Sequence, residues 1–427
     1  KAGDDNSKVE IHIYDINNNK TAKAEYEQGD IYIPRIKWSQ DDNSLVVYWM
    51  NRYQNDLKLL ATNAQTGASS LLYQEKNKYY VEINDDWWYL KDGKNYLFTS
   101  EMNGFKHLYL YSLDGKTKVQ VTKGNYEVTD VNGVDEVNKR IYFTMAYPRP
   151  MDRNVFVTDF EGKKTFPLTE GEAWHRIQLN NDFTKFYCFR TDINTPQTVT
   201  QHDIIVDKKK NISAQLVKTV NESKKLKEKI SEYGYGKVEF IRVPNSKGDT
   251  LNGWMLRPAD FDPAKKYPTL LYCQGGPQSA LTQFYSFRWN LQLMAANGYI
   301  VVAPNRRGMP GFGQDWNEAI SGDWGGQPIR DYLSAIDDMA KEPYVDNSRL
   351  GAVGASYGGY SVYMLAGKHE KRFKTFIAHC GLFDMQSWYG ATEELWFANF
   401  DLKGSYWQKP QPKAYTDFNP MNFVDKW

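Results

Sequence analysis

The fold of this chain is decided by the stretch Gly354-Ala355-Ser356-Tyr357-Gly358-Gly359. It follows the short run Arg349–Val353, whose pattern is typical of a strand, and it precedes a helical run over Tyr360–His369. A strand, a tight Gly-x-Ser-x-Gly turn and a helix place a serine on a sharp turn at the carboxyl end of a sheet. The flanking glycines let neighbouring backbone pack against this turn without a Cβ clash, so we expect the Ser356 hydroxyl to be exposed.

Two interpretations of this serine stand side by side. Ser356 could be only the N-cap of the helix in a glycine-rich turn, or it could be a nucleophile. The flanking strand, the helix and the second glycine favour the nucleophile. The helix amino terminus would then direct free N–H groups and a positive dipole end at an anion formed there. The glycine spacing does not match a dinucleotide-binding fingerprint, and no Walker lysine follows.

The composition limits the partners. The length of 427 residues suggests two domains, and 53 Lys and Arg balance 52 Asp and Glu, so no global charge favours nucleic acid or an anionic membrane. Aromatic residues make up 15% of the chain, which is typical of a β-rich protein. No apolar run approaches the roughly 18 residues of a membrane span. No metal or cofactor is predicted, and we expect buried thiols at Cys188, Cys273 and Cys380.

Residues 1–210 contain a repeat. Short β-like runs end between 47 and 49 residues apart, and most are followed by a polar turn. A period of this length with about four strands per unit is typical of β-propeller blades. The sequence therefore predicts a partial β-propeller over residues 1–210, with four to five blades present. The repeated runs are His12–Asp15, Leu60–Asn63, Tyr109–Ser112, Phe156–Asp159 and Ile204–Asp207.

Residues 211–235 are predicted to be a linker. The composition shifts over Lys208–Ile230 towards many lysines and few aromatic residues. This run could be a basic docking patch, but a run of charge is usually a solvated face, and we favour the linker.

The hydrophobic period changes in residues 236–427. Val238–Val243 and Leu251–Leu256 form a predicted strand pair, after which apolar strands alternate with amphipathic helices up to Phe376–Ala378. This alternation predicts a doubly wound, mostly parallel sheet with helices on both faces, whose site lies at the carboxyl ends of the strands. The other predicted elements are strands over Thr269–Cys273 and Tyr299–Ala303, a helix over Phe287–Ala296, and a helix with Ile329, Leu333, Ile336 and Met339 on one face.

Loops that leave such strand ends carry residues suited to acyl transfer. A serine that attacks a carbonyl generates an oxyanion, which needs two preorganised donors worth on the order of 3 kcal/mol each. The backbone N–H of Tyr357, next to the nucleophile, supplies one donor. We expect the second from the loop after the earlier strand, where Gln274 precedes two glycines and a proline.

The chain resembles the prolyl oligopeptidase family of serine peptidases, in which a β-propeller caps an α/β-hydrolase domain. The first half is similar to the dipeptidyl peptidase IV branch, through "KAGDDNSKV", Asn51-Arg52 with Asn55, and "VTKGNYEV". The second half is closer to the dipeptidyl peptidase V and acylaminoacyl-peptidase type. Its matching segments are "YPTLLYCQGGPQS", "VVAPNRRGMPGFGQDW", "DYLSAIDDMA" and "RLGAVGASYGGYSVYMLAG".

The chain also departs from that family. Ala355 stands where the dipeptidyl peptidase IV branch has tryptophan, and Gln274 stands where relatives place tyrosine or histidine as an oxyanion donor; a glutamine amide can still donate. By the resemblance, the segment "CGLFDMQSWYGATEEL" corresponds to the substrate pocket, which Phe383, Trp388 and Tyr389 would line. The adjacent pair Glu393-Glu394 is not expected to be the family's amino-terminal clamp, and we assign it to a solvated helix face.

The base of a catalytic triad is not found after Ser356. His369 lies at the far end of the elbow helix and His379 ends the next strand, so neither is expected to be the base. In the family, a stretch like "FNPMNFVDKW" comes just before the strand with the acid. The resemblance therefore implies that the catalytic domain, over residues 236–427, is truncated before its Asp and His, and that residues 1–427 alone are close to inactive.

The leading hypothesis is a serine exopeptidase that releases amino-terminal dipeptides from short peptides. An alternative is an acylaminoacyl-peptidase or esterase, because the chemistry of Ser356 does not select amide over ester. A third is a non-catalytic scaffold without a triad. The family resemblance also implies a periplasmic or secreted protein that can form a homodimer.

Overall fold

The structure, a computed structural model, describes residues 4–39 and 42–427. The first three residues of the amino-terminal "KAGDDNSKV" motif therefore lie outside the described residues. The chain divides into two compact units, one formed by residues 1–143 and 157–166 and the other by residues 144–156 and 167–427. Within the described ranges, no helix is long and apolar enough to cross a membrane.

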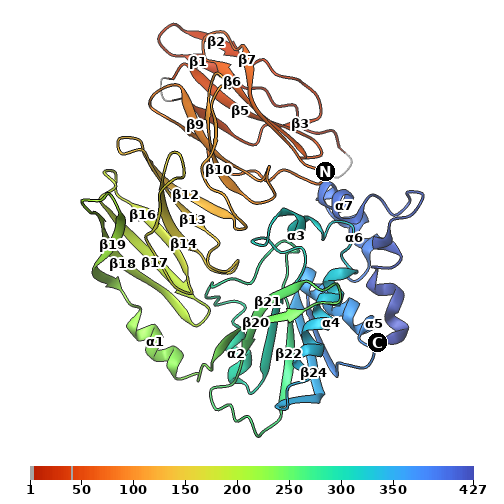
Figure 1. Cartoon of the computed structure of the whole chain (residues 1–427). Coiled ribbons are helices and arrows are strands. Elements are labelled where there is room, and N and C mark those ends of the chain that lie inside the picture. The colour runs from red at the N-terminus through yellow and green to blue at the C-terminus, as the bar shows by residue number, and fades with distance from the viewer. Residues whose placement is uncertain (1–3, 40–41) are drawn as a thin grey trace. The chain divides into compact units, whose positions relative to one another are not determined.

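The predicted repeat corresponds to a series of antiparallel sheets (Figure 1). A two-stranded sheet β1-β2 comes first, followed by β3-β5-β6-β7 with β4 at its side, and then by four-stranded sheets β8–β11, β12–β15 and β16–β19. The repeated runs of the sequence fall in β1, β6, β10, β14 and β18. Four blade-like sheets and one partial sheet thus confirm the predicted partial β-propeller. The bounds are β1 (His12–Asp15), β2 (Lys20–Lys23), β3 (Ile31–Tyr32), β4 (Ile36–Trp38), β5 (Ser44–Asn51), β6 (Asp56–Asn63), β7 (Ser69–Lys76), β8 (Trp88–Tyr89), β9 (Asn95–Ser100), β10 (His107–Ser112), β11 (Lys118–Gln120), β12 (Val128–Asp135), β13 (Arg140–Met145), β14 (Asn154–Asp159), β15 (Thr165–Pro167), β16 (Trp174–Leu179), β17 (Lys185–Asp192), β18 (Thr195–Val206) and β19 (Ile212–Asn221).

The repeat in the sequence marks turns as well as strands. At the ends of β1, β6, β14 and β18, an Asp or Asn side chain accepts a hydrogen bond from the backbone N–H two residues further on. Such turns reverse the chain and lead into the next antiparallel strand. The residues at these turns are Asp15, Asn63, Asp159 and Asp207.

Aromatic side chains fill the core between the second and third of these sheets. Trp87 stacks on Tyr96 with ring centroids 4.2 Å apart, and Phe98 lies 5.0 Å from Tyr111 in an edge-to-face contact. Both rings of each pair lie in one cluster of buried residues. Stacked and edge-to-face aromatic pairs bury large apolar areas, which accounts for the high aromatic content of the sequence.

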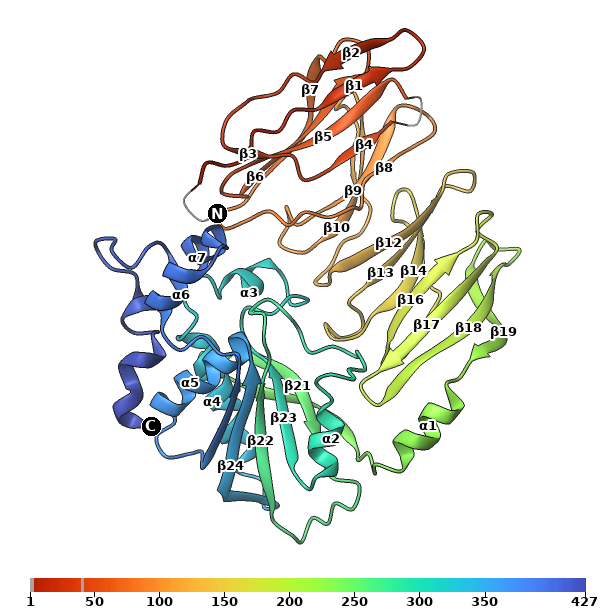
Figure 2. The same ribbon diagram turned by 180° about the vertical axis from the view of Figure 1, so that it is seen from behind.

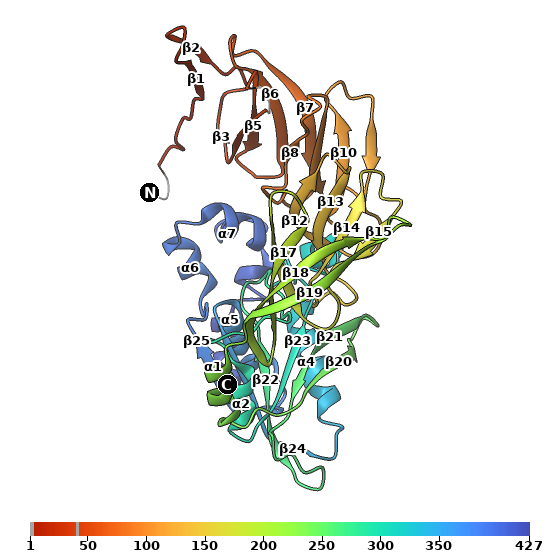
Figure 3. The same cartoon turned by 90° about the vertical axis from the view of Figure 1, so that its left-hand side faces the viewer.

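The segment predicted as a linker contains regular structure. Its first part is β19, which pairs with β18 along its length and completes a four-stranded sheet, as Figure 3 shows. A short helix, α1 (Lys224–Ser231), follows. The lysines are compatible with both elements because most side chains of β19 and α1 face solvent.

The second half contains the predicted mostly parallel sheet, in the order β20-β21-β23-β22-β24-β25 (Figure 2). β21 runs antiparallel to β20 and β23, and the remaining neighbours are parallel. This arrangement confirms an α/β-hydrolase domain. The bounds are β20 (Val238–Pro244), β21 (Thr250–Leu256), β22 (Tyr267–Cys273), α2 (Leu291–Ala296), β23 (Ile300–Asn305), α3 (Gln314–Glu318), α4 (Gln327–Met339), β24 (Val345–Ala355), α5 (Tyr357–Lys368), β25 (Thr375–His379), α6 (Met385–Ala391), α7 (Leu395–Leu402) and the 3-10 helices η1 (Lys413–Tyr415) and η2 (Pro420–Lys426).

Helices cover both faces of this sheet because successive strand residues point to opposite sides. Leu271 and Val302 face the core built with α4 and α5. Their neighbours Leu270 and Val301 face the core that includes residues of α2 and the buried Met151. The expected helix over Phe287–Ala296 begins later, at Leu291, because the Asn290 side chain accepts the backbone N–H of Gln292 and caps it.

Candidate active site

Ser356 lies on a strained turn between β24 and α5. Its backbone has φ 57° and ψ −124°, a conformation that costs a non-glycine residue about 1–3 kcal/mol. Ser356 is exposed, whereas Gly354, Tyr357 and Gly358 around it are buried. The turn is fixed to the neighbouring strand, because the Ser356 N–H donates to the carbonyl of His379 at 2.9 Å. The serine hydroxyl is therefore presented at the carboxyl end of the sheet.

Glycines on both sides of the serine are required by backbone contacts. A Cβ on Gly354 would lie 2.6 Å from the carbonyl oxygen of Cys273, and a Cβ on Gly358 would lie 2.1 Å from the same atom. The obstacle is main chain of β22, which cannot rotate away like a side chain. The turn and β22 can approach this closely only because both positions lack a side chain.

Tyr357 contributes its backbone to the turn and its side chain to the core. It is the first residue of α5, where backbone N–H groups have no partner within the helix. Its hydroxyl donates to the carbonyl of Trp324 at 2.7 Å, and its ring packs edge-on against Trp324. Burial raises the pKa of the Tyr357 hydroxyl, so the side chain is a neutral anchor. The Tyr357 side chain thus holds the start of α5 in the core, directly beside Ser356.

Gln274 lies on a loop that packs against this turn. A Cβ on the adjacent Gly275 would lie 3.0 Å from the carbonyl oxygen of Ala355 and 3.6 Å from Cβ of Ser356. The Gln274 side-chain amide donates to Oγ of Ser279 at 3.2 Å. The structure therefore brings the loop of Gln274 and the turn of Ser356 together, as expected from the order of the strands.

Gln274 also lines a cavity of about 170 Å³ that the sequence analysis did not foresee. Trp254, Tyr272 and Trp289 form part of its wall. Trp289 connects this cavity to the turn, because its ring lies 5.8 Å from the ring of His379. The signal in the sequence was weak, since these aromatic residues come from separate elements and share no spacing.

The three expected pocket residues pack in different places. The Tyr389 ring is buried and its hydroxyl donates to the Asn399 side chain at 2.7 Å. Phe383 lies against the rings of Tyr363 and Trp427. Trp388 is linked to Tyr357 through another ring: its ring lies 5.9 Å from that of Trp324, which in turn contacts Tyr357. These positions do not form one pocket wall among the described contacts.

Within the described residues, neither His369 nor His379 is hydrogen bonded to the Ser356 hydroxyl. Nδ1 of His369 accepts the backbone N–H of Phe373 at 3.1 Å, and burial lowers the His369 pKa. His379 contributes its carbonyl to the turn, while its ring faces Trp289. In the described part of the chain, no side chain is hydrogen bonded to Oγ of Ser356. Glu393 and Glu394 are exposed, but they directly precede α7 instead of lying along a helix face.

One cysteine prediction is wrong. Cys188 and Cys273 are buried, whereas Cys380 is exposed. Cys380 follows the edge strand β25 in a turn with φ 48°, at the carboxyl end of the sheet. The next residue, Gly381, packs against Gly359 of α5, whereas the Cys380 side chain faces solvent. No group of His, Cys, Asp and Glu suited to a metal ion occurs within residues 4–39 and 42–427.

Two family models match the chain. Residues 1–197 match the "Dipeptidyl peptidase IV (DPP IV) N-terminal region", and residues 285–427 match the "Prolyl oligopeptidase family". The first match covers the blade-like sheets up to the start of β18, and the second covers the part of the α/β domain that contains Ser356.

Similar proteins were found among curated sequences and solved structures. The chain is 58% identical over 187 residues to dipeptidyl-peptidase 5 of Porphyromonas gingivalis, covering 43% of the chain and 27% of that protein. It is 44% identical over 278 residues to dipeptidyl-peptidase 5 of Porphyromonas endodontalis, covering 65% of the chain and 39% of that protein. The structure of dipeptidyl peptidase 4 of Porphyromonas gingivalis superposes with a TM-score of 0.85 at 26% identity, covering 99% of the chain and 58% of that protein.

The aligned parts thus span well under two thirds of the length of each of these proteins. The family matches, the blade-like sheets and the serine on its elbow agree with one another. The chain belongs to the prolyl oligopeptidase family.

Proposed function

We propose that the natural protein is a serine exopeptidase that releases dipeptides from the amino terminus of short peptides. The observation that carries this proposal is the exposed Ser356 on its strained turn, with the loop of Gln274 packed beside it. In the proposed reaction, Oγ of Ser356 attacks the carbonyl of the second residue and forms an acyl-enzyme. The N–H of Tyr357 and the amide of Gln274 stabilise the oxyanion.

The preference for dipeptides is supported by the relatives. Both curated proteins similar to the chain are named dipeptidyl-peptidase 5. The reaction also requires a base at Oγ of Ser356 and a carboxylate that orients the base. Since no described side chain is bonded to that oxygen, the proposal requires both groups to come from elsewhere in the natural protein.

The proposed substrate pocket lies near the elbow. We assign Trp388 to it, because Trp388 is connected to Tyr357 through Trp324. Phe383 and Tyr389 belong to the proposed pocket only if the segment around α6 rearranges when substrate binds.

Chromogenic substrates test the proposal. The natural protein is assayed with a dipeptide anilide that has a free amine, with an N-acetylated aminoacyl anilide, and with a short-chain ester. We expect the free dipeptide to be hydrolysed with a kcat/KM at least about tenfold above that of the acetylated substrate. Preference for the acetylated substrate or the ester would favour the acylaminoacyl-peptidase or esterase, and no turnover of any substrate would favour the scaffold.

The proposal extends to location and assembly. A periplasmic or secreted protein would be recovered from the periplasmic or culture fraction of the source cells, and recovery in the cytoplasmic fraction would contradict this. A homodimer would elute with twice the monomer mass when light scattering is measured after gel filtration.

A further inference from the structure

Arg306 is a buried cation directly beneath the candidate active site. It follows the last residue of β23, and it is the largest of the fully buried side chains among the described residues. A guanidinium keeps its positive charge in proteins, and removal of such a charge from water costs several kcal/mol unless it is compensated. A buried arginine at this position is therefore costly unless its contacts or its function compensate for the charge.

The contacts of Arg306 compensate this charge only in part. Its guanidinium donates to the carbonyl oxygens of Arg307 and Pro277, both at 2.9 Å. Its Cζ lies 4.4 Å from the centre of the Tyr357 ring. Nε has no hydrogen-bond partner, and no Asp or Glu in residues 4–39 and 42–427 forms an ion pair with this side chain. Two neutral carbonyls, the hydroxyl of Tyr332 and an aromatic face replace the carboxylate that a buried arginine usually has.

These contacts join the two elements that carry the proposed oxyanion donors. Pro277 lies on the loop that begins with Gln274, and Tyr357 begins α5. One guanidinium thus fixes the loop and the helix start relative to each other. The hydroxyl of Tyr332 also donates to the carbonyl of Gln274, at 3.4 Å, from the side of α4.

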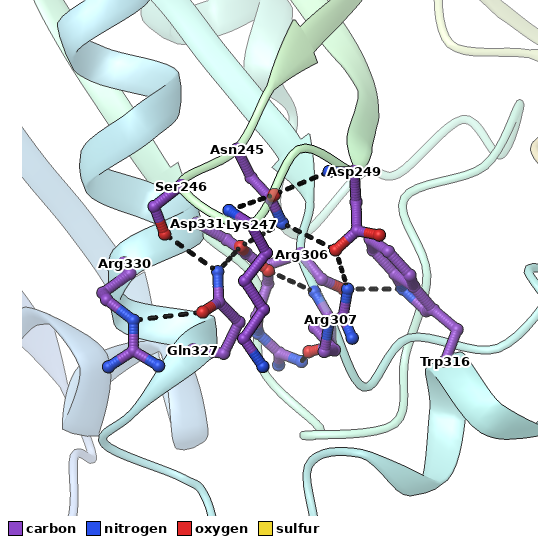
Figure 4. Close-up of polar contacts among 10 residues, drawn as sticks. All are labelled: Asn245, Ser246, Lys247, Asp249, Arg306, Arg307, Trp316, Gln327, Arg330 and Asp331. Carbon is purple, nitrogen blue, oxygen red and sulfur yellow. Dashed lines mark hydrogen bonds and ion pairs between the residues drawn. The ribbon is translucent and has the colours of Figure 1, made fainter.

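A polar network holds the backbone beside Arg306 in place (Figure 4). The backbone N–H of Arg307 donates to Asp331 at 2.8 Å, and Asp331 also accepts from Asn245 at 2.9 Å and from Gln327 at 2.7 Å. Asp331 is fully buried, and this burial raises its pKa although the three donors act in the opposite direction. The backbone beside Arg306 is therefore tied to the turn between β20 and β21 and to α4, which fixes the point from which the Arg306 side chain extends.

We propose that Arg306 is a positioning residue for the oxyanion hole and that its charge favours the anion formed there. This inference rests on the proposed function. A fixed positive charge near the reacting carbonyl stabilises a transition state that gains negative charge, without reorganisation during the reaction. The charge is incompletely compensated in the resting protein, so it interacts more favourably with the oxyanion than with the neutral substrate.

Two substitutions in the natural protein separate the positioning role of Arg306 from the effect of its positive charge. Arg306→Met removes the charge and the donors but keeps the length of the side chain. Arg306→Lys keeps the charge but cannot span both carbonyls as a planar fork can. Arg349→Met is the matched control, because Arg349 is an exposed arginine within β24 that pairs with Asp346. The measurements are kcat and KM for a dipeptide anilide, the affinity for a product dipeptide, and the affinity for a dipeptide boronic acid that forms a tetrahedral adduct with a serine.

We expect Arg306→Met to lower kcat by about 30-fold with little change in KM, which is less than the loss of a direct donor. Boronic acid affinity should fall by a similar factor, while product affinity and the Arg349→Met control stay within about twofold. Arg306→Lys should recover part of the loss. Equal losses of boronic acid and product affinity would overturn the proposal, because they would indicate a general packing defect.

If Arg306→Met does not fold, Arg306→Lys tests the proposed role of Arg306. Full activity of a folded Arg306→Lys protein would overturn the positioning role. Failure of the parent protein to release dipeptides or to bind the boronic acid would overturn the proposed function, and with it this inference. An active parent with unaffected variants would overturn this inference alone.

Discussion

Buried charges are treated differently in two regions of this protein. In the blade-like sheets, Glu101 lies beside a small cavity of about 30 Å³. Burial, followed by the charges of Glu82, Glu127 and Glu75, raises its pKa to about 8. By taking up a proton, Glu101 avoids the free-energy cost of a charge that is shielded from water. Arg306 beneath the elbow cannot lose its charge in this way, and it forms no ion pair among the described residues.

This difference shows which kind of buried ionisable group gives information about function. A buried carboxyl group that becomes neutral near neutral pH fits into a core at low cost. A buried guanidinium with only carbonyls, a hydroxyl and a ring around it stays costly, so its presence indicates a use for the charge. Backbone packing does not follow this division: Gly358 at the elbow and Gly67 and Gly162 in the first half all lie against main-chain oxygens, whereas Gly115 in a blade turn has nothing within 4 Å of an added Cβ.

The largest expected effect is on this backbone packing. Gly358→Ala would place a Cβ 2.1 Å from the carbonyl oxygen of Cys273, so we expect the free energy of unfolding to fall by more than about 4 kcal/mol, or the domain not to fold. Gly115→Ala is the matched variant in a blade turn, where φ is +72° but nothing lies within 4 Å of the added Cβ. It should cost about 1 kcal/mol. Urea unfolding measures both, and similar midpoints would show that the main-chain contact at Gly358 does not determine the cost.

The second effect concerns the rate of the reaction. Gln274→Ala removes a side-chain donor of the proposed oxyanion hole, and we expect kcat of the natural protein to fall by about 100-fold with KM nearly unchanged. Gln278→Ala on the same loop is the control and should leave kcat within about twofold. A change in KM alone would show that Gln274 binds the substrate and the transition state equally well.

A smaller effect is expected on the pH dependence of stability. The folded protein holds a proton on Glu101 up to about pH 8, whereas an unfolded chain loses it near its ordinary pKa of about 4.3. Between these values the folded state binds more protons, so the free energy of unfolding falls as pH rises through this window. We expect a fall of about 2 kcal/mol, less than the full shift, because the carboxyl is only partly shielded from water.

Glu101→Gln should flatten this pH dependence and stabilise the protein above about pH 8. Thermal unfolding at a series of pH values measures it. Glu161→Gln, on an exposed blade turn, is the control and should keep the slope of the parent. A Glu101→Gln variant with the parent's slope would show that Glu101 does not hold the proton.

The smallest effect is the release of backbone strain. Ser356→Gly should raise the free energy of unfolding by about 1 kcal/mol, because glycine adopts φ 57° and ψ −124° with little strain. Ser356→Ala keeps the Cβ and should not gain this stability. Equal stability of the two variants would mean that the turn is not strained.

The sequence was informative where a feature is local and uninformative where it depends on packing. The blade repeat was predictable because strand ends such as Asp15 and Asp159 form the same turn each time. The elbow was predictable because its glycines are adjacent in sequence. The exposure of Cys380 and the burial of Tyr389 depend on which elements cover them, which no local pattern encodes.

Two further features were also beyond the sequence. β19 was taken for a linker because lysines on an exposed strand resemble a solvated segment. The role of Arg306 was missed, although its loop was identified, because two adjacent arginines do not show which one turns inwards. Arg307 is half-buried and pairs with Asp249, whereas Arg306 is fully buried.

The most direct test of this account is the site of covalent labelling in the natural protein. The protein is treated with a fluorophosphonate, digested, and analysed by mass spectrometry. We predict a single modification on Ser356, together with loss of dipeptide release. An unmodified Ser356 peptide, or a label on another serine that accompanies inactivation, would contradict the assignment of Ser356 as the nucleophile.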